Sequence, residues 1–387
     1  MAPFFIDEQK RPMVKWCARK GSSRLLRAVS NVLFPAVVAL MAACAGPTRH
    51  ESPEGAAVEA TGVAVAASMR LPSPEVWGGQ ARCTEVAGCR WVAVEHDVSA
   101  VVLYALDGRR QHLLSRHAVA YHPDSAKWID DRHVVAAVEK SRSLDIFAVT
   151  ADGQLQPKAQ IDVGFEPRDV MVLPARDGGW LLLATPYRGR QVAWVHWRPN
   201  GATRVVPQTW CATPWHVTAV PRGPRGQGPG LVTSCLDDNQ VLYLPLPDAL
   251  DTAVATQPQA VHRFDHVARR VGVTPSGRYW YVALETGGKV ARYDVTTDVW
   301  QMLPFTAFGA VGVAPYDDDT VAWGENNRVL IVRYDAAGQV LAQRSVPVSG
   351  LPTELQWIDV DRDGHLDLMS MNSTGPASDV LFGPSLP

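Results

Sequence analysis

The sequence predicts an all-β protein built from one repeating sheet unit, and three observations support this. Short apolar strands separated by Pro/Gly/Asp turns recur from about residue 76 onward. The chain contains 30 Gly, 29 Pro and 13 Trp, a composition that favours tight turns and short strands over long helices. The unit returns every 40–53 residues, which is the period of a four-stranded propeller blade. A jelly roll or sandwich also has many short strands but would not repeat at this interval.

The composition limits the classes of protein that the chain can represent. Its 387 residues are 47% hydrophobic, enough for a large core in one all-β domain. With 37 basic and 39 acidic residues, the formal net charge is −2, and nothing suggests a nucleic-acid partner.

The N-terminal segment, residues 1–43, is interpreted as a signal peptide. Basic residues between positions 10 and 27 precede an apolar run over 28–43, which is too short for a convincing membrane span. The sequence Leu40-Met41-Ala42-Ala43-Cys44 resembles the lipobox of bacterial lipoproteins, with Met41 where leucine is usual. The resemblance implies lipidation of Cys44 and anchoring in the cell envelope, with the outer membrane favoured because no aspartate follows the cysteine. A cleaved signal without lipid and an uncleaved anchor are the alternatives.

Residues 44–75 are rich in Ala, Glu, Pro and Ser and are predicted to form a flexible tether. Within this segment, residues 62–71 alternate enough to form one strand. The last blade has room for about three strands, so this segment is the candidate that completes it and removes two open sheet edges. The alternative is that it is simply tether.

The cysteines indicate disulfides. Cys83, Cys89, Cys211 and Cys235 are an even number in an oxidising compartment, and three pairings are possible. We favour Cys83–Cys89 and Cys211–Cys235, because each pair closes a loop within one proposed blade.

Residues 76–387 form the proposed propeller. Equivalent valines of five clear units recur at intervals of 48, 53, 40 and 47 residues, and they are Val172, Val220, Val273, Val313 and Val360. Residues 90–114 and 126–163 fit two further units, which gives about seven blades. The Val-x-Val-x-Pro-x-Gly pattern, as in Val271 to Gly277, resembles blades of YVTN/lactonase-type propellers.

An acidic loop near the C-terminus predicts a calcium site. Its carboxylates alternate around a glycine, and the proposed ligands are Asp359, Asp361, Asp363 and Asp367 with the backbone carbonyl of His365. Hard oxygen ligands at this spacing suit Ca²⁺, although a solvated acidic turn is the alternative. Flanked by strands, the loop resembles the FG-GAP/VCBS repeat of integrin-type propellers over residues 355–383. The ion would stabilise a turn and is interpreted as structural.

Polar residues at the starts of proposed inner strands are the candidates for chemistry at the channel mouth. The principal set is Asp169, His216, Arg270 and Glu354, with Arg168, Trp215 and Arg269 beside them. These residues could grip a ligand, or they could only pair with one another and with strand-end backbone groups. No sequence motif fixes their mutual distances, and no Gly-x-Ser-x-Gly, His-Glu-x-x-His or phosphate-binding loop is present.

The favoured functional hypothesis is a calcium-stabilised propeller that binds a protein, peptide or glycan at the cell envelope. The first alternative is a lactonase-like hydrolase, which requires Asp169, His216, Arg270 and Glu354 to converge across the channel. The second is a structural subunit of an envelope complex, which would present a flat apolar patch or blade edge. The sequence therefore makes the convergence of these four side chains the deciding observation.

Overall fold

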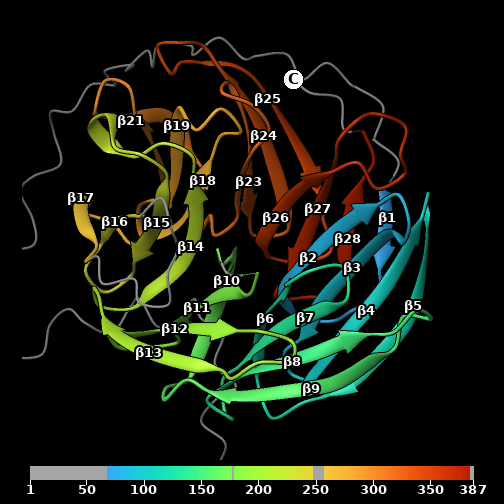
Figure 1. Ribbon diagram of the computed structural model, residues 1–387. Helices are drawn as coiled ribbons and strands as arrows, with labels where there is room; N and C mark the ends of the chain where they lie inside the picture. Colours follow the sequence, from blue (N-terminus) through green and yellow to red (C-terminus); the bar gives the residue numbers. More distant parts are fainter. Residues whose placement is uncertain (1–67, 177, 247–256, 384–387) are drawn as a thin grey trace, which may run out of the picture. The chain divides into compact units, whose positions relative to one another are not determined.

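The computed structural model describes residues 68–176, 178–246 and 257–383, which form seven four-stranded antiparallel sheets. The innermost strands contact one another in sequence order, and the last of them contacts the first, so the sheets form a closed ring (Figure 1). The predicted all-β propeller of about seven four-stranded blades is confirmed. The predicted signal peptide and Cys44 lie outside the described residues.

The first three blades take their strands consecutively from the chain, from the innermost strand outward. Blade 1 contains β2 (Val76–Thr84), β3 (Gly88–Glu95), β4 (Ala100–Asp107) and β5 (Arg110–Ala118). Blade 2 contains β6 (Pro123–Trp128), β7 (His133–Val138), β8 (Ser143–Val149) and β9 (Leu155–Asp162). Blade 3 contains β10 (Pro167–Pro174), β11 (Trp180–Pro186), β12 (Gln191–Trp197) and β13 (Arg204–Thr209).

The next three blades follow the same plan. Blade 4 contains β14 (Pro214–Val220), β15 (Gly230–Cys235), β16 (Gln240–Pro245) and β17 (Gln259–Arg263). Blade 5 contains β18 (Ala268–Val273), β19 (Tyr279–Leu284), β20 (Lys289–Asp294) and β21 (Val299–Thr306). Blade 6 contains β22 (Val313–Pro315), β23 (Thr320–Glu325), β24 (Arg328–Tyr334) and β25 (Val340–Pro347). Short 3₁₀ helices lie at η2 (Pro224–Gly226) and η3 (Glu285–Gly287).

Blade 7 is built from both ends of the described chain. Its inner strands are β26 (Pro352–Ile358), β27 (Asp367–Asn372) and β28 (Ser378–Leu381). The outermost strand is β1 (Ser68–Leu71), which pairs antiparallel with β28. These four residues belong to the segment 62–71 proposed for ring closure, and its residues 62–67 lie outside the described part. Leu71 and Val380 are fully buried, so the closing strand contributes to the core.

The core lies between neighbouring blades, where the two faces of adjacent sheets pack together. Apolar strands such as β11 are buried along most of their length, as expected for sheets covered on both faces. Trp91, Trp194, Trp280 and Trp323 are among the largest fully buried side chains. Outer strands such as β25 instead alternate between half-buried and exposed residues, which is the pattern of a sheet with one solvated side.

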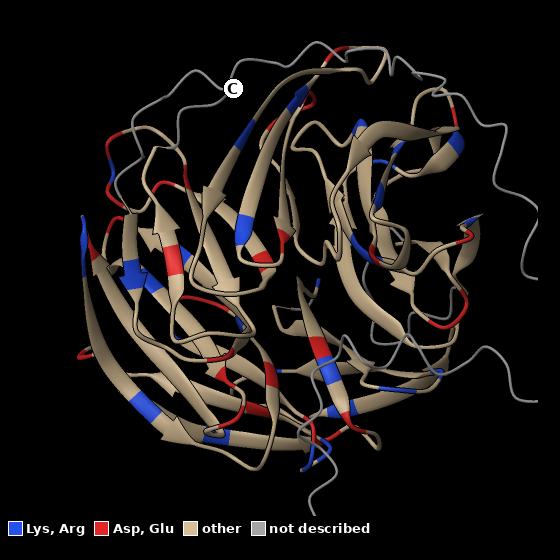
Figure 2. Cartoon of the chain, turned by 180° about the vertical axis from the view of Figure 1, so that it is seen from behind, with Lys and Arg blue, Asp and Glu red and all other residues tan. Residues whose placement is uncertain are grey.

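Both proposed disulfides are present. Cys83 and Cys89 face each other across β2 and β3, and Cys211 joins Cys235 at the end of β15. Basic and acidic residues are interspersed over strands and loops (Figure 2), in keeping with the near-balanced charge. Among the described residues, no helix has the length and apolar character that a bilayer crossing requires.

Candidate active site at the channel mouth

The inner strands share a local irregularity that positions the site. In six blades the first residues of the inner strand carry a register shift relative to the next strand, and the shifts lie at Val76/Gly79, Pro123/Ser125, Pro167/Asp169, Pro214/His216, Ala268/Arg270 and Pro352/Glu354. A β-bulge of this kind re-aims side chains and is common beside active sites. Four of these shifts come directly before a polar residue whose side chain lies at the channel mouth. These four residues are Asp169, His216, Arg270 and Glu354.

Asp169 of β10 and His216 of β14 form a buried pair between neighbouring blades. Nδ1 of His216 lies 2.7 Å from Oδ2 of Asp169, and Ser125 Oγ donates a 2.8 Å hydrogen bond to Oδ1. Burial would raise the pKa of Asp169, but the hydrogen bond with His216 and the charges of Lys127 and Arg270 outweigh it and lower the pKa. Burial, aided by the charge of Arg270, lowers the pKa of His216, which favours the neutral imidazole at pH 7. Asp169 therefore orients a neutral histidine through Nδ1.

Glu354 of β26 is the acceptor of a second cluster. Lys127 Nζ lies 2.5 Å and Arg270 Nη1 3.3 Å from Oε1 of Glu354, while the backbone N–H of Gly79 donates to Oε2 at 3.1 Å. Burial would raise the pKa of Glu354, but the positive charges of Lys127 and Arg270 outweigh it and lower the pKa. Two cations and one carboxylate thus leave net positive charge beside the Asp169–His216 pair.

Arg168 supplies another cation at the same mouth. Its guanidinium lies 4.4 Å from the ring of Trp77 and 4.3 Å from the ring of Trp215, and Nη1 is 2.5 Å from Oδ1 of Asp124. Two aromatic faces hold the guanidinium between them by cation–π attraction. Arg168 is therefore a fixed, planar donor suited to carboxylate or phosphate groups.

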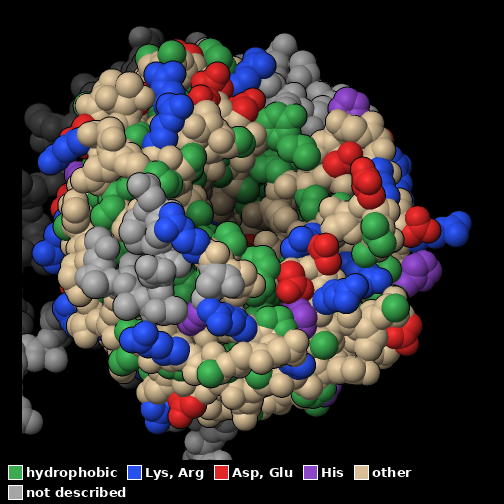
Figure 3. Space-filling view, in the orientation of Figure 1, with side chains coloured by type: hydrophobic (Ala, Val, Ile, Leu, Met, Phe, Trp, Pro, Cys, Tyr) green, Lys and Arg blue, Asp and Glu red, His purple; other side chains and the backbone are tan. Residues whose placement is uncertain are grey.

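These residues surround a small polar cavity. Its volume is about 10 Å³, close to the minimum that holds one water molecule, and Asp169, Arg270 and Glu354 line it with Ser125 and Trp215. Figure 3 shows one face of the ring hollowed at its centre, with charged side chains beside the hollow. The cavity can hold a water molecule beside the carboxylate of Asp169 and the guanidinium groups of Arg168 and Arg270.

Three of the four predicted residues, Asp169, Arg270 and Glu354, thus line one cavity, and the fourth, His216, contacts Asp169. The four residues come from four different blades. Sequence reasoning missed their partners, which are Trp77, Asp124, Ser125 and Lys127. A signal for two of them was present, because Pro123-Asp124-Ser125 has the same Pro-x-polar form as Pro167-Arg168-Asp169 and Pro214-Trp215-His216. Lys127 lies within a buried strand, and no local pattern marked it.

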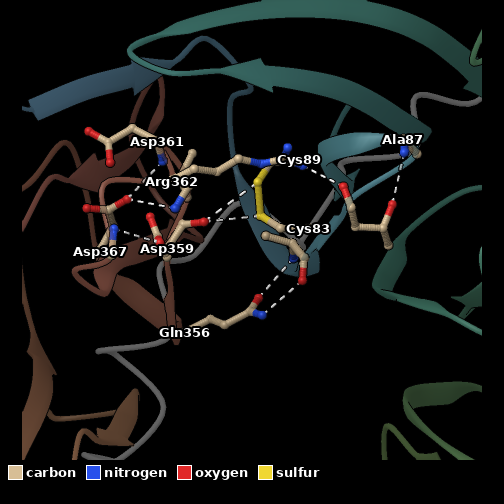
Figure 4. The surroundings of a disulfide bond; sticks show 12 residues. Cys83, Ala87, Cys89, Gln356, Asp359, Asp361, Arg362 and Asp367 are labelled. Atoms are coloured by element: carbon tan, nitrogen blue, oxygen red, sulfur yellow. Dashed lines mark hydrogen bonds between the residues drawn. A yellow bond between two sulfur atoms is a disulfide. The ribbon is translucent and has the colours of Figure 1, made fainter.

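The acidic loop of blade 7 lies apart, beside the Cys83–Cys89 disulfide (Figure 4). The carboxylates of Asp359, Asp361 and Asp363 have oxygens within 4.8 Å of one another. Gly364 adopts φ +88°, a left-handed conformation that glycine tolerates, and its N–H donates to Asp359 Oδ2 at 3.1 Å. The turn gathers three of the four predicted carboxylates.

The fourth carboxylate, Asp367, has a different environment. It is fully buried, and its oxygens accept backbone hydrogen bonds of 2.8 Å from Val360 and 2.7 Å from Gly383. Asp367 therefore ties the start of the acidic loop to the segment that follows β28.

The loop fits a hard cation. Oδ1 of Asp359 and Oδ1 of Asp361 are buried and have no hydrogen-bond partner, and the Asp361 side chain is only 10% exposed. Buried carboxylate oxygens without partners are costly, and a divalent cation with oxygen ligands would satisfy both.

Comparison with known proteins supports the propeller fold. No family model and no curated relative matches the chain. A putative 6-phosphogluconolactonase from Bacteroides fragilis is similar at TM-score 0.57 and 17% identity, covering 74% of this chain and 87% of that chain. The Pseudomonas aeruginosa periplasmic gluconolactonase PpgL is similar at TM-score 0.55 and 17% identity, covering 70% and 85%. Virginiamycin B lyase from Staphylococcus aureus is similar at TM-score 0.56 and 10% identity, covering 82% and 99%. The chain is a seven-bladed propeller with neighbours of lactonase and lyase type.

Proposed function

We propose that the channel mouth hydrolyses small anionic lactones or related cyclic esters. The observation that carries this proposal is the His216–Asp169 pair beside a cavity that Asp169, Arg270 and Glu354 line. Candidate general bases are recognised first by geometry and then by pKa, and His216 satisfies both. Structural similarity to proteins named as lactonases supports the same class of reaction at the level of the fold.

Each residue has a defined role in this reaction. His216 Nε2 takes a proton from water while the water oxygen attacks the lactone carbonyl carbon, and Asp169 orients the imidazole through Nδ1. Arg270 lies where it can stabilise the oxyanion that develops, and Arg168 binds the anionic group of the substrate. The ring C–O bond then breaks, and the leaving oxygen recovers the proton from the imidazolium. The products balance as lactone plus water giving a hydroxy acid.

Hydrolysis of 6-phosphogluconolactone and gluconolactone by the purified protein tests the proposal, with acid release followed in a pH-stat. We expect His216→Ala and Asp169→Asn to lower kcat/KM by about 10²–10⁴-fold, the usual contribution of general acid–base catalysis. Because the pKa of His216 is lowered from 6.5, the midpoint of the acid-side fall in the wild-type rate should lie below pH 6.5.

The matched control is His112→Ala, since His112 is exposed on β5 of blade 1 and outside the cluster. This variant should hydrolyse lactones at the wild-type rate. Wild-type protein that hydrolyses neither lactone, or a fully active His216→Ala variant, would refute the hydrolase.

A second candidate is a binding module for an anionic protein, peptide or glycan of the cell envelope. It is favoured by the small volume of the cavity, about 10 Å³, and by the mutual pairing of most of its charges. In that case an anionic ligand would bind through Arg168 without turnover. Calorimetry with a non-hydrolysable sugar phosphate separates the two, because binding without any lactone hydrolysis supports the module.

We propose separately that the acidic loop binds Ca²⁺ as a structural ion. The two partnerless oxygens of Asp359 and Asp361 support this assignment. The loop contacts blade 1, because Arg362 Nη2 donates to Thr84 O at 2.5 Å and Arg109 Nε lies 3.8 Å from Asp361 Oδ2. By fixing the loop, the ion would stabilise these contacts.

A further inference from the structure

A second group of potential ligands lies on blades 1 and 2, outside the residues assigned to hydrolysis. His96 and Asp97 follow β3, and His122 precedes β6. One ligand atom from each of these three residues lies within 4.8 Å of the other two. We define this group as the rim cluster. The three side chains come from two blades, so the folded ring assembles them.

Both imidazoles of the rim cluster have one nitrogen turned toward a carboxylate. Nδ1 of His96 lies 3.1 Å from Oδ1 of Asp124, and Nδ1 of His122 lies 3.5 Å from Oε2 of Glu139. Metal-binding histidines commonly donate their other ring N–H to a carboxylate, which fixes the tautomer and strengthens the ligand. The arrangement leaves Nε2 of both rings as the atoms for a metal.

Asp97 supplies the third ligand of the cluster. Nε2 of His96 lies 4.0 Å from Oδ1 of Asp97, a separation that one ion can bridge. His122 has φ +59°, an uncommon backbone conformation for a residue with a side chain. Strain of this kind persists where surrounding structure holds it, often at ligand sites.

From this geometry we propose that His96, Asp97 and His122 bind a divalent transition-metal ion of the Zn²⁺ type. Two imidazole nitrogens and one carboxylate favour such an ion over Ca²⁺, which prefers oxygen ligands. Three protein ligands leave a fourth position for water or a substrate oxygen.

The position of the ion connects it to the channel mouth. Asp124 Oδ1 contacts both His96 Nδ1 and Arg168 Nη1, so one carboxylate links a metal ligand to the proposed anion-binding arginine. The ring of His96 also lies 5.1 Å from that of Trp77, which packs on Arg168. A bound ion would add positive charge beside the residues that receive an anionic ligand.

Titration of the EDTA-treated protein with Co²⁺ and Zn²⁺ tests the proposal, with excess Ca²⁺ present to occupy the acidic loop. We expect one Co²⁺ per chain with the visible absorption of nitrogen-ligated, low-coordinate Co²⁺, displaced by one Zn²⁺. Asp97→Asn and His122→Asn should abolish this spectrum. Both variants should fold, since the Asp97 side chain is 64% exposed and asparagine tolerates the left-handed backbone of His122.

Two further variants separate a metal site from a chance cluster. Glu139→Gln should weaken Zn²⁺ binding by about 10–100-fold while keeping the spectrum, as expected for a residue that orients a ligand. His112→Ala, a change of an exposed histidine, should bind as wild type. Wild-type protein that binds no Co²⁺, or a His122→Asn variant that binds it unchanged, overturns the proposal. Neither measurement depends on lactone hydrolysis.

Discussion

At the scale of single residues, the channel mouth contains buried titratable side chains whose protonation states depend on one another. The pKa of Asp169 is lowered mainly by its hydrogen bond with His216, and the pKa of Glu354 is lowered by the charges of Lys127 and Arg270, in each case against the cost of burial. The pKa of His216 is lowered mainly by burial. All three groups therefore favour the folded state at neutral pH and lose that contribution as the solution becomes acidic.

Glu354→Gln is expected to destabilise the protein at pH 7 by about 3–5 kcal/mol, because it leaves Lys127 and Arg270 buried with one partner fewer. The folded-state pKa of Glu354 lies below the ordinary glutamate value of 4.5, so its contribution is present above pH 4.5 and is lost as pH falls through the folded pKa. The difference between the melting temperatures of wild type and variant should therefore shrink below pH 4.5.

Glu166→Gln is the matched control, because its partner Lys140 is at the surface and the Glu166 side chain is 46% exposed. This variant should melt close to wild type at every pH. An equal difference between Glu354→Gln and wild type at pH 7 and pH 3 would contradict the role given to Glu354.

At the scale of elements, the inner strands could be predicted from the sequence better than the outer ones. Segments such as Trp180–Pro186 are nearly all apolar, so their strand character was visible. Outer strands such as Arg204–Thr209 and Gln259–Arg263 alternate between half-buried and exposed residues and were not recognised. Asp169 and His216 were predicted because polar residues began apolar strands. The bulges that bring them together depend on pairing with the next strand, which no local pattern reveals.

The acidic loop of blade 7 is expected to make the stability of the protein depend on Ca²⁺. Removal of Ca²⁺ by chelation should lower the melting temperature of the wild-type protein, because the ion stabilises only the folded loop. Asp361→Ala should lower it as well and should remove the effect of Ca²⁺. Differential scanning calorimetry with 1 added equivalent of Ca²⁺ and with excess Ca²⁺ would measure both effects. The difference between the two melting temperatures gives the contribution of weak Ca²⁺ sites.

Asp317→Ala serves as a control, since Asp317 lies in an exposed turn of blade 6, where it caps backbone N–H groups. It should leave the response to Ca²⁺ intact. If chelation and Asp361→Ala both leave the wild-type melting curve unchanged, the loop has no structural ion.

At the scale of the whole propeller, stability depends on the strand that joins the two ends of the described chain. Leu71 of β1 is fully buried and pairs in register with Ser378 of β28. Inner strands of blades 7 and 1 are also joined by side-chain hydrogen bonds, including both amide contacts of Gln356 with Ala81 at 2.9 Å. Among the sheets that the structure describes, blade 7 is the one that pairs strands from distant parts of the chain.

Leu71→Ala should destabilise the protein by about 2–5 kcal/mol, the usual cost of removing a large buried side chain. Deletion of residues 1–75 should cost more, because it removes β1 and exposes the edge of β28. Deletion of residues 1–67 keeps β1 and is the matched control. Urea unfolding of the three proteins gives the comparison, and equal midpoints for the two deletions would show that β1 does not contribute.

The pairing of β1 with β28 also bears on how the protein is made. Ser68 and Leu381 are register partners although they lie more than 300 positions apart. During synthesis, therefore, the first described strand leaves the ribosome long before its neighbour exists. Six blades can form from their own consecutive strands, whereas the seventh must wait until β28 has been synthesised. Until then, β1 lacks its partner strand and blade 7 is an incomplete sheet.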